Sequence, residues 1–290
     1  MTAVGAPLAH GPVGMPGPGG WLLALLLPAA AATFYLTGRQ VLLRRGAAWP
    51  IGRGVAAAGG LAVLAVALAP PVADRAEDFR VHVAQHLALT MVVPLLLACS
   101  APVTLALRTL PRRPRRALLR VLHSRPLRVL TAPLVVVVLE LGSLTALYLT
   151  PLFGAVHSSP VLHPLVHAHM LLTGCLVAWL LTGVDPMPRR PATSVRMIVL
   201  VLLAAGHGVL AKLIYVHPPA ALGAAGEVRG GAQLLYYGGD AAELLLAVAV
   251  MTEWYRRTGR RLHAEQRRAA ATANSSTEGA VPDRGAHRRW

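Results

Sequence analysis

The stretch RVHVAQHLALTMVVPLLLACSAP, residues 80–102, decides the fold class of this chain. Its apolar run is long enough to enter ~30 Å of hydrocarbon as a helix, because a helix rises about 1.5 Å per residue. The run nevertheless opens with two histidines, His82 and His86, spaced one helical turn apart. Ionisable side chains are costly in lipid, so we looked to the rest of the sequence for the reason that these two histidines are present.

The composition is that of a membrane protein. Hydrophobic residues make up 55% of the 290 residues and charged residues only 14%, with a mean hydropathy of +0.54. The apolar residues gather in blocks that are each long enough to cross a bilayer as a helix. We therefore predict an all-α, polytopic membrane protein with a bundle of seven transmembrane helices, built from the blocks at 21–37, 55–70, 82–107, 127–149, 163–183, 195–216 and 233–254.

The net charge of +16 is explained by topology rather than by a nucleic-acid partner. Arginine fills alternate loops, with eight in 108–128 and nine after residue 255, whereas the opposite loops hold only Arg75, Arg80 and Arg229. By the positive-inside rule, the N-terminus lies outside and the C-terminus in the cytoplasm. This orientation requires an odd number of spans, and seven satisfies it.

The ends of the chain differ from the apolar middle. Residues 1–20 are rich in Gly and Pro and contain no Lys or Arg, so they are predicted to form a flexible extracytoplasmic tail rather than a cleaved signal peptide. Residues 21–258 form the seven-helix domain. Residues 259–290 are polar and basic and are predicted to be a disordered cytoplasmic tail.

Histidine follows the opposite asymmetry to arginine. Of twelve histidines, nine fall outside or in the outer halves of the predicted helices. The third and fifth helices both enter from outside, so the pair His82 and His86 lies at the same depth as the pair His163 and His167. Met170 continues the face of His163 and His167, while His169 is expected to point roughly the other way. We expect these side chains to line an outward-facing polar cavity.

We take as the candidate site all the polar side chains that are expected to line this cavity. Each histidine alone could simply lie at the membrane interface or make a structural hydrogen bond. The candidate metal ligands are His82, His86, His163, His167, His169, Met170 and His207. The candidates for supporting the ligands or handling protons are Glu140, Lys212, Asp240 and Glu243.

Imidazole with thioether and no clustered thiolate favours copper, although zinc would also accept the His and Asp groups. Haem held axially by His86 and His167 is the first alternative. Proton-coupled or copper transport through Lys212, Asp240 and Glu243 is the second. No nucleophile motif, phosphate loop or cofactor fingerprint occurs, so we do not expect an enzyme.

Four segments together resemble the CtaG family of cytochrome c oxidase assembly factors, in its actinobacterial form: HVAQHLALTMVVPLLLACSAP (82–102), HPLVHAHMLLTGCLVAWLLTGVDP (163–186), GHGVLAKLIY (206–215) and YYGGDAAELLLAVAVMTEWYRR (236–257). The resemblance implies a multi-pass protein of the bacterial plasma membrane that is needed to form an active haem-copper oxidase and that delivers copper to an oxidase subunit in the same membrane. It also implies site roles for His82, His86, His167, His169, His207 and Asp240.

Overall fold

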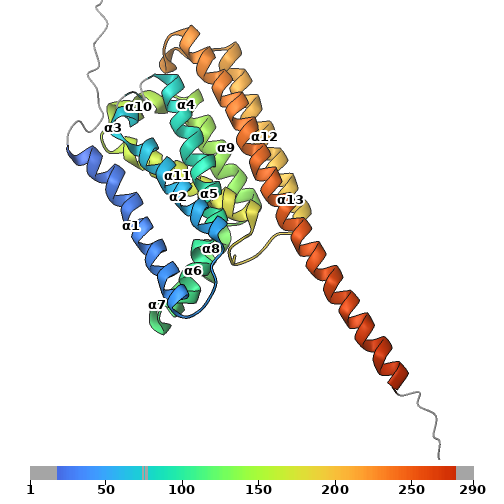
Figure 1. Ribbon diagram of the computed structural model, residues 1–290. Helices are drawn as coiled ribbons and strands as arrows, with labels where there is room; N and C mark the ends of the chain where they lie inside the picture. The colour runs from blue at the N-terminus through green and yellow to red at the C-terminus, as the bar shows by residue number, and fades with distance from the viewer. Residues whose placement is uncertain (1–17, 74, 76–77, 279–290) are drawn as a thin grey trace, which may run out of the picture. The chain divides into compact units, whose positions relative to one another are not determined.

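A computed structural model describes residues 18–73, 75 and 78–278, and within them every regular element is a helix. The elements in chain order are α1 (Pro18–Arg44), α2 (Ile51–Leu68), α3 (Pro70–Ala73), α4 (Phe79–Leu87), the π-helical turn η1 (Ala88–Val92), α5 (Val93–Ser100), α6 (Pro102–Thr109), α7 (Arg112–Leu122), α8 (Arg125–Leu130), α9 (Pro133–Leu149), α10 (Leu152–Ser158), α11 (Leu162–Thr182), α12 (Thr193–Val216), the 3₁₀ turn η2 (Ala220–Leu222) and α13 (Ala225–Glu278). Figure 1 shows this order along the chain.

Five helical segments of the described chain are long and apolar enough to cross a membrane: Ile51–Leu68, Phe79–Thr109, Leu162–Thr182, Thr193–Val216 and Ala225–Arg267. A sixth is possible if α9 and α10 act as one span, although they are bent by 80° relative to each other. The 27-residue α1 is not among the five. The seven apolar blocks of the sequence lie mostly in helices, with short breaks, and the all-α, multi-pass fold class holds.

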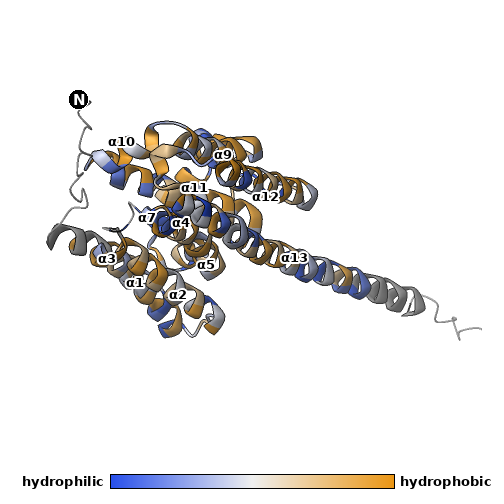
Figure 2. Cartoon of the chain, turned by 90° about the horizontal axis from the view of Figure 1, so that it is seen from above, coloured by the Kyte–Doolittle hydropathy of each residue, from blue (hydrophilic) through white to orange (hydrophobic). Residues whose placement is uncertain are grey.

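Large aliphatic side chains are exposed along several helices of the bundle. Figure 2 shows that hydrophobic residues predominate in these helices. Leu134 on α9, Leu172 on α11 and Val209 on α12 are 74%, 64% and 65% exposed. A soluble chain rarely exposes a continuous apolar surface, whereas a membrane chain presents one to lipid. The exposed faces therefore agree with the sequence composition.

The segment from α4 to α6 is one span with two irregular points, and proline explains both. Pro94 has no N–H to donate to the Thr90 carbonyl four residues earlier, and the wide turn η1 forms there. Ala101 adopts the left-handed conformation with φ 56°, and Pro102 begins α6 directly after it. The Asp185 carboxylate accepts hydrogen bonds from the backbone N–H groups of Val103 and Thr104 at 3.0 and 2.7 Å and so caps α6.

The block at 127–149, predicted as one helix, is divided. Its first residues belong to α8, which the Ser124 hydroxyl caps by accepting from the Leu127 N–H. Pro133 begins α9, because proline is well suited to the first turn of a helix and cannot continue a preceding one. The chain then bends at Pro151 into the short α10, which carries His157.

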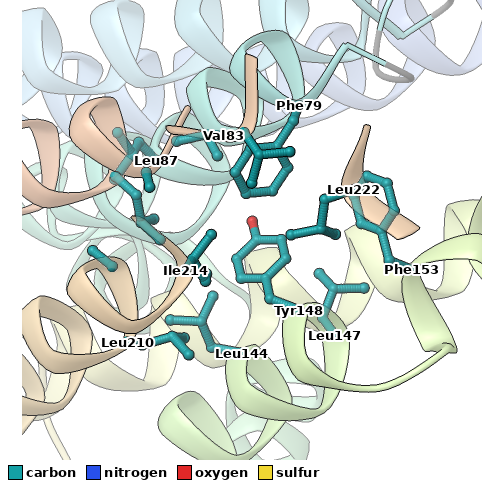
Figure 3. Close-up of a cluster of buried hydrophobic side chains, with 14 of the residues drawn as sticks. Phe79, Val83, Leu87, Leu144, Leu147, Tyr148, Phe153, Leu210, Ile214 and Leu222 are labelled. Atoms are coloured by element: carbon teal, nitrogen blue, oxygen red, sulfur yellow. The ribbon is translucent and has the colours of Figure 1, made fainter. Parts of the chain in front are cut away.

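Tyr148 lies in the middle of the largest buried apolar cluster. Figure 3 shows its ring surrounded by Phe79, Val83, Ile214 and Leu222, with the phenolic oxygen pointing into the cluster. The Phe79 ring meets it edge-on at a centroid separation of 5.4 Å. This cluster joins α4, α9, α10, α12 and α13, and it encloses the side of α4 that carries the histidines.

Glycines set the spacing between the helices beside this cluster. A Cβ at Gly231 or Gly239 of α13 would lie 2.3 Å from Phe79 or His207, respectively. A Cβ at Gly174 of α11 would lie 2.2 Å from the Thr90 carbonyl oxygen in η1. The close contacts of α13 with α4 and α12, and of α11 with η1, therefore depend on these glycines.

The chain divides into two units, residues 1–250 and residues 251–290. In the second unit, the helix α13 continues to Glu278, whereas the sequence predicted disorder from residue 259. The segment 260–278 contains no Gly or Pro and is rich in Ala and Arg, which are strong helix formers. The predicted N-terminal tail lies almost wholly outside the described residues, as does the end of the C-terminal one.

Candidate metal site in a layer of buried imidazoles

The helix α4 buries both histidines of the HVAQH motif, His82 at 1% and His86 at 3% exposure. They stand one turn apart on one face, as the i, i+4 spacing predicts. The side chain of Asp78 accepts a hydrogen bond from the Arg80 N–H at 2.8 Å and so fixes the start of α4. Both imidazoles therefore sit on a rigid element rather than on a loop.

Four imidazoles form what we call the His82 cluster, made of His82, His157, His163 and His167. The His82 ring lies 5.6 Å from that of His157 and 6.3 Å from that of His167, measured between centroids. The His163 ring lies 4.4 Å from His167 and 5.9 Å from His157. Each of the four rings thus lies next to two of the others, and the rings come from α4, α10 and α11.

Hydrogen bonds orient two of these rings. His167 places Nδ1 2.8 Å from the His163 carbonyl and Nε2 3.0 Å from Gln85 Oε1. The Gln85 amide nitrogen donates at 2.7 Å to the carbonyl of Ala67, which fixes the direction of the amide. His157 likewise places Nδ1 2.8 Å from the Phe153 carbonyl. A ring nitrogen that faces an acceptor oxygen donates its proton to it, so both nitrogens of His167 face acceptors while Nδ1 of His157 donates to a carbonyl.

A second group, the His86 cluster, consists of His86, His207 and Glu243. The rings of His86 and His207 are stacked at a centroid separation of 6.3 Å. His207 Nδ1 lies 3.6 Å from the Glu243 carboxylate, and both side chains are buried. Tyr148 contacts the two clusters at once, because its ring lies 5.7 Å from that of His82 and 6.0 Å from that of His86.

A cavity of about 260 Å³ opens beside His86, between η1, α9 and α11. Its polar lining comprises His86, Thr90, Glu140, Ser143, His169 and Thr173, and Met170 adds a thioether. His169, which was predicted to point roughly the other way from His163 and His167, lines this cavity together with Met170. Within α11, His163 and His167 belong to the His82 cluster instead.

Several buried polar atoms in this layer have no hydrogen-bond partner within the described part of the chain. They include both ring nitrogens of His82, Nδ1 of His86, Nε2 of His207, Oε2 of Glu140 and the Tyr148 hydroxyl. Buried polar atoms are usually paired, and leaving one unpaired costs about 1–3 kcal/mol. This concentration of unpaired donors and acceptors distinguishes the layer from an ordinary helix-packing core.

The layer is not a preformed metal cage. Among the described residues, no three His, Cys, Asp or Glu side chains are placed to hold one ion together. Lys212 and Asp240 also differ from the expectation, since both are exposed side chains rather than members of the buried layer. The other nine candidate residues all lie in the two clusters or the cavity.

Sequence reasoning missed Gln85, Tyr148 and His157 as members of the layer. Gln85 is a polar residue within the HVAQH motif, so the motif itself carried a signal for it. His157 falls between the predicted helices 127–149 and 163–183, and the bend before α10 brings it next to His82. Nothing in the sequence marked Tyr148 among the apolar residues of α9.

Comparisons with known proteins find sequence relatives of this chain in mycobacteria. The uncharacterized protein MT0111 of Mycobacterium tuberculosis is 38% identical over 181 residues, and ML1998 of Mycobacterium leprae is 34% identical over a stretch of the same length. Each alignment covers 59% of this chain but only 27% or 28% of the relative, so the chain spans about a quarter of the length of the curated relatives it matches. No solved structure matches the chain.

The model of one protein family, the cytochrome c oxidase caa3 assembly factors (Caa3_CtaG), matches residues 33–257. The match includes α4, α11, α12 and most of the apolar part of α13, and hence both histidine clusters and the cavity. The resemblance carried by the four histidine- and glycine-containing segments is thereby confirmed. This chain belongs to the family of cytochrome c oxidase caa3 assembly factors.

Proposed function

We propose that this chain is a non-enzymatic assembly factor that binds copper in its imidazole layer and passes it to a subunit of a haem-copper oxidase in the same membrane. The observation that carries the proposal is the set of buried imidazole nitrogens on His82, His86 and His207 that have no hydrogen-bond partner among the described residues. A bound ion would satisfy an unprotonated nitrogen of these rings and so remove its desolvation cost. Family membership supplies the oxidase as the target.

The donor chemistry supports copper as the cargo. The His82 cluster provides imidazoles alone, while His86, His169 and the Met170 thioether share the cavity. Imidazole and thioether ligands suit copper better than they suit magnesium or calcium. Because the side chains must rotate to reach one ion, we expect binding that is reversible, as a carrier requires.

The geometry gives less support to the two alternatives. The cavity of about 260 Å³ is smaller than the roughly 300–1,000 Å³ typical of pockets for organic ligands, which favours an ion over haem. Transport was predicted to run through Lys212, Asp240 and Glu243, and only Glu243 is buried in the layer, whereas Lys212 and Asp240 are exposed. The carrier function therefore remains our choice.

We further propose seven spans in the bacterial plasma membrane, with the N-terminus outside and the C-terminus in the cytoplasm. The five apolar spans, the α9 and α10 pair and α1 together would supply the seven. The arginines of α7 and of the connection between α1 and α2 support this orientation. This orientation would place α10 and the first turns of α4 and α11 on the outer side of the membrane, where copper destined for the oxidase would arrive.

Metal analysis of the purified full chain tests copper binding. We expect the wild-type chain to retain copper after the metal is supplied and excess is removed, and the double variant His82→Ala with His86→Ala to retain markedly less. His123→Ala is the matched control, because this exposed histidine bonds only within α7 and its loop. Equal copper in all three proteins would rule out the site.

Complementation tests delivery to the oxidase. A strain that lacks this chain should assemble an oxidase with reduced copper, and the wild-type gene should restore it. The double histidine variant should be present in the membrane at normal level and fail to restore the copper. Full restoration by a variant that binds no copper would show that the chain acts on the oxidase by a route other than copper delivery.

A further inference from the structure

Two charged side chains lie on an exposed face made by α12 and α13. Lys212 of α12 lines a groove of about 490 Å³ together with Gln233, Tyr236 and Tyr237 of α13. Asp240 continues the same stripe of α13, three and four residues beyond the two tyrosines, and is exposed. The face thus carries one cation and one anion.

Both charges lie within apolar spans rather than at their ends. Gly239 approaches His207 so closely that a Cβ there would lie 2.3 Å from the ring, so Asp240 is at the level of His207. His207 is nine residues before the end of α12 at Val216, which corresponds to about 14 Å along the helix. Lys212 is four residues before the same end, or about 6 Å.

Neither charge has an ion-pair partner among the described residues. Lys212 places Nζ over the Tyr236 ring, 5.0 Å from the centroid. No ion pair or hydrogen bond joins Asp240 to any residue that the structure describes. An unpaired charge facing lipid at this depth is strongly disfavoured, so the face needs a polar partner within the membrane.

The placement of the two charges fits a partner with the same face. Side chains tilt toward the N-terminus of their helix, and α12 and α13 are antiparallel neighbours. The Lys212 side chain therefore tilts toward the middle of the membrane, and the Asp240 side chain tilts toward the level of Lys212. The two charged groups thus lie at a similar depth. A face with both signs in one layer is self-complementary under a two-fold rotation about the membrane normal.

We propose that this face is an interface between two copies of the chain, in which Lys212 of each copy pairs with Asp240 of the other. Gln233 and Tyr237 line the same seam and offer hydrogen bonds across it. A lipid headgroup would match Lys212 alone, because its phosphate stays at the membrane surface and does not reach the level of Asp240. A second copy satisfies both charges.

Charge reversal tests the pairing. Full-length chains with two different tags are expressed together, solubilised in mild detergent and captured by one tag. Lys212→Asp alone and Asp240→Lys alone should each lower co-capture by on the order of tenfold, because like charges then face each other. Lys212→Asp on one tagged chain with Asp240→Lys on the other should restore it, since each mixed dimer regains two opposite-sign pairs.

The mixed experiment separates this interface from an ion pair within one chain, because neither single variant can form an internal pair. Single variants that self-associate like the wild type, or a mixture that fails to recover, would overturn the proposal. Cysteine cross-linking in unsolubilised membranes gives a second readout. Tyr237→Cys should yield a disulfide-linked dimer, while Leu172→Cys, on the exposed side of α11, should not. No dimer from Tyr237→Cys, or an equal yield from both, would also count against the interface.

Discussion

His207 of α12 faces Glu243 of α13 with 3.6 Å between Nδ1 and the carboxylate, and Gly239 is what lets the two helices come this close. Glycine at this position has no Cβ to strike the imidazole, so His207 lies against the backbone of α13 one turn before Glu243. The same ring stacks on His86 at 6.3 Å. The position of one copper-site candidate is thus set by the absence of a side chain on the neighbouring helix.

Gly239→Ala should disturb the His86 cluster. The new Cβ would lie 2.3 Å from Cε1 and Nδ1 of His207, so the ring or the helix must move. We expect a loss of about 1–3 kcal/mol in the free energy of unfolding, as for other overpacked cores, and a reduced copper content. Thermal unfolding of the detergent-solubilised chain and metal analysis measure the two effects.

Gly226→Ala is the control for that substitution. It lies on the same helix α13, and a Cβ there would meet nothing within 4 Å. Alanine is favoured over glycine within a helix by roughly 0.5–1 kcal/mol, so this variant should be as stable as the wild type or slightly more so. If Gly239→Ala behaved in the same way, the helix spacing at His207 would not depend on glycine.

Much of the fold could be predicted from the sequence, because the bilayer imposes a simple length and polarity rule on each helix. The blocks at 163–183 and 195–216 agree with α11 and α12 to within two residues at each end. The block at 127–149 failed, since its average hydropathy hides the break before Pro133. Polarity alone does not separate an exposed helix from disorder, so the sequence did not predict that α13 continues to Glu278.

The members of the site were easier to predict than their arrangement. Histidines at i, i+4 on α4 and α11 were placed in one layer, and His82 and His167 do come together. The sequence could not show which neighbour packs against each side of α11, so it did not predict the cavity that His169 lines. Helix rotation and crossing depend on contacts such as Gly174 against Thr90, which join residues far apart in the chain.

Gly174→Ala should be more damaging than Gly239→Ala. Its Cβ would lie 2.2 Å from the carbonyl oxygen of Thr90, and a backbone carbonyl cannot rotate away as a side chain can. The helix α11 would have to withdraw from η1, so we expect a loss of about 3 kcal/mol or more in unfolding free energy. Gly142→Ala on α9, which meets nothing within 4 Å, should have no such effect. Equal stability of the two variants would contradict the close packing.

Tyr148→Phe should cost little stability. The Tyr148 hydroxyl is buried without a hydrogen-bond partner among the described residues, so its removal relieves a desolvation cost. We expect unfolding free energy to stay unchanged or rise by about 1 kcal/mol. Tyr35→Phe is the contrasting variant, because the Tyr35 hydroxyl donates to the Ser100 carbonyl at 3.1 Å and accepts from Trp49 Nε1 at 3.0 Å. It should lose about 1–3 kcal/mol. A destabilised Tyr148→Phe would reveal an ordered partner for the hydroxyl, such as water.

Asp185→Asn should destabilise the start of α6, where the chain breaks between α5 and α6, without altering the proposed copper site. The buried carboxylate accepts from the N–H groups of Val103 and Thr104, and the Thr104 hydroxyl donates to it at 2.5 Å. An amide keeps one acceptor oxygen but loses the charge that favours binding at a helix N-terminus, so we expect a loss of about 1–2 kcal/mol in unfolding free energy. Thr104→Ser retains the hydroxyl and should lose less.

Copper content measured below the unfolding transition separates this structural role from a ligand role. Asp185 neither lines the cavity nor belongs to either histidine cluster, so Asp185→Asn should bind as much copper as the wild type at low temperature. A fall in copper without a fall in stability would mean that Asp185 acts on the metal site. That result would extend the site from the imidazole layer to the connection between α11 and α12.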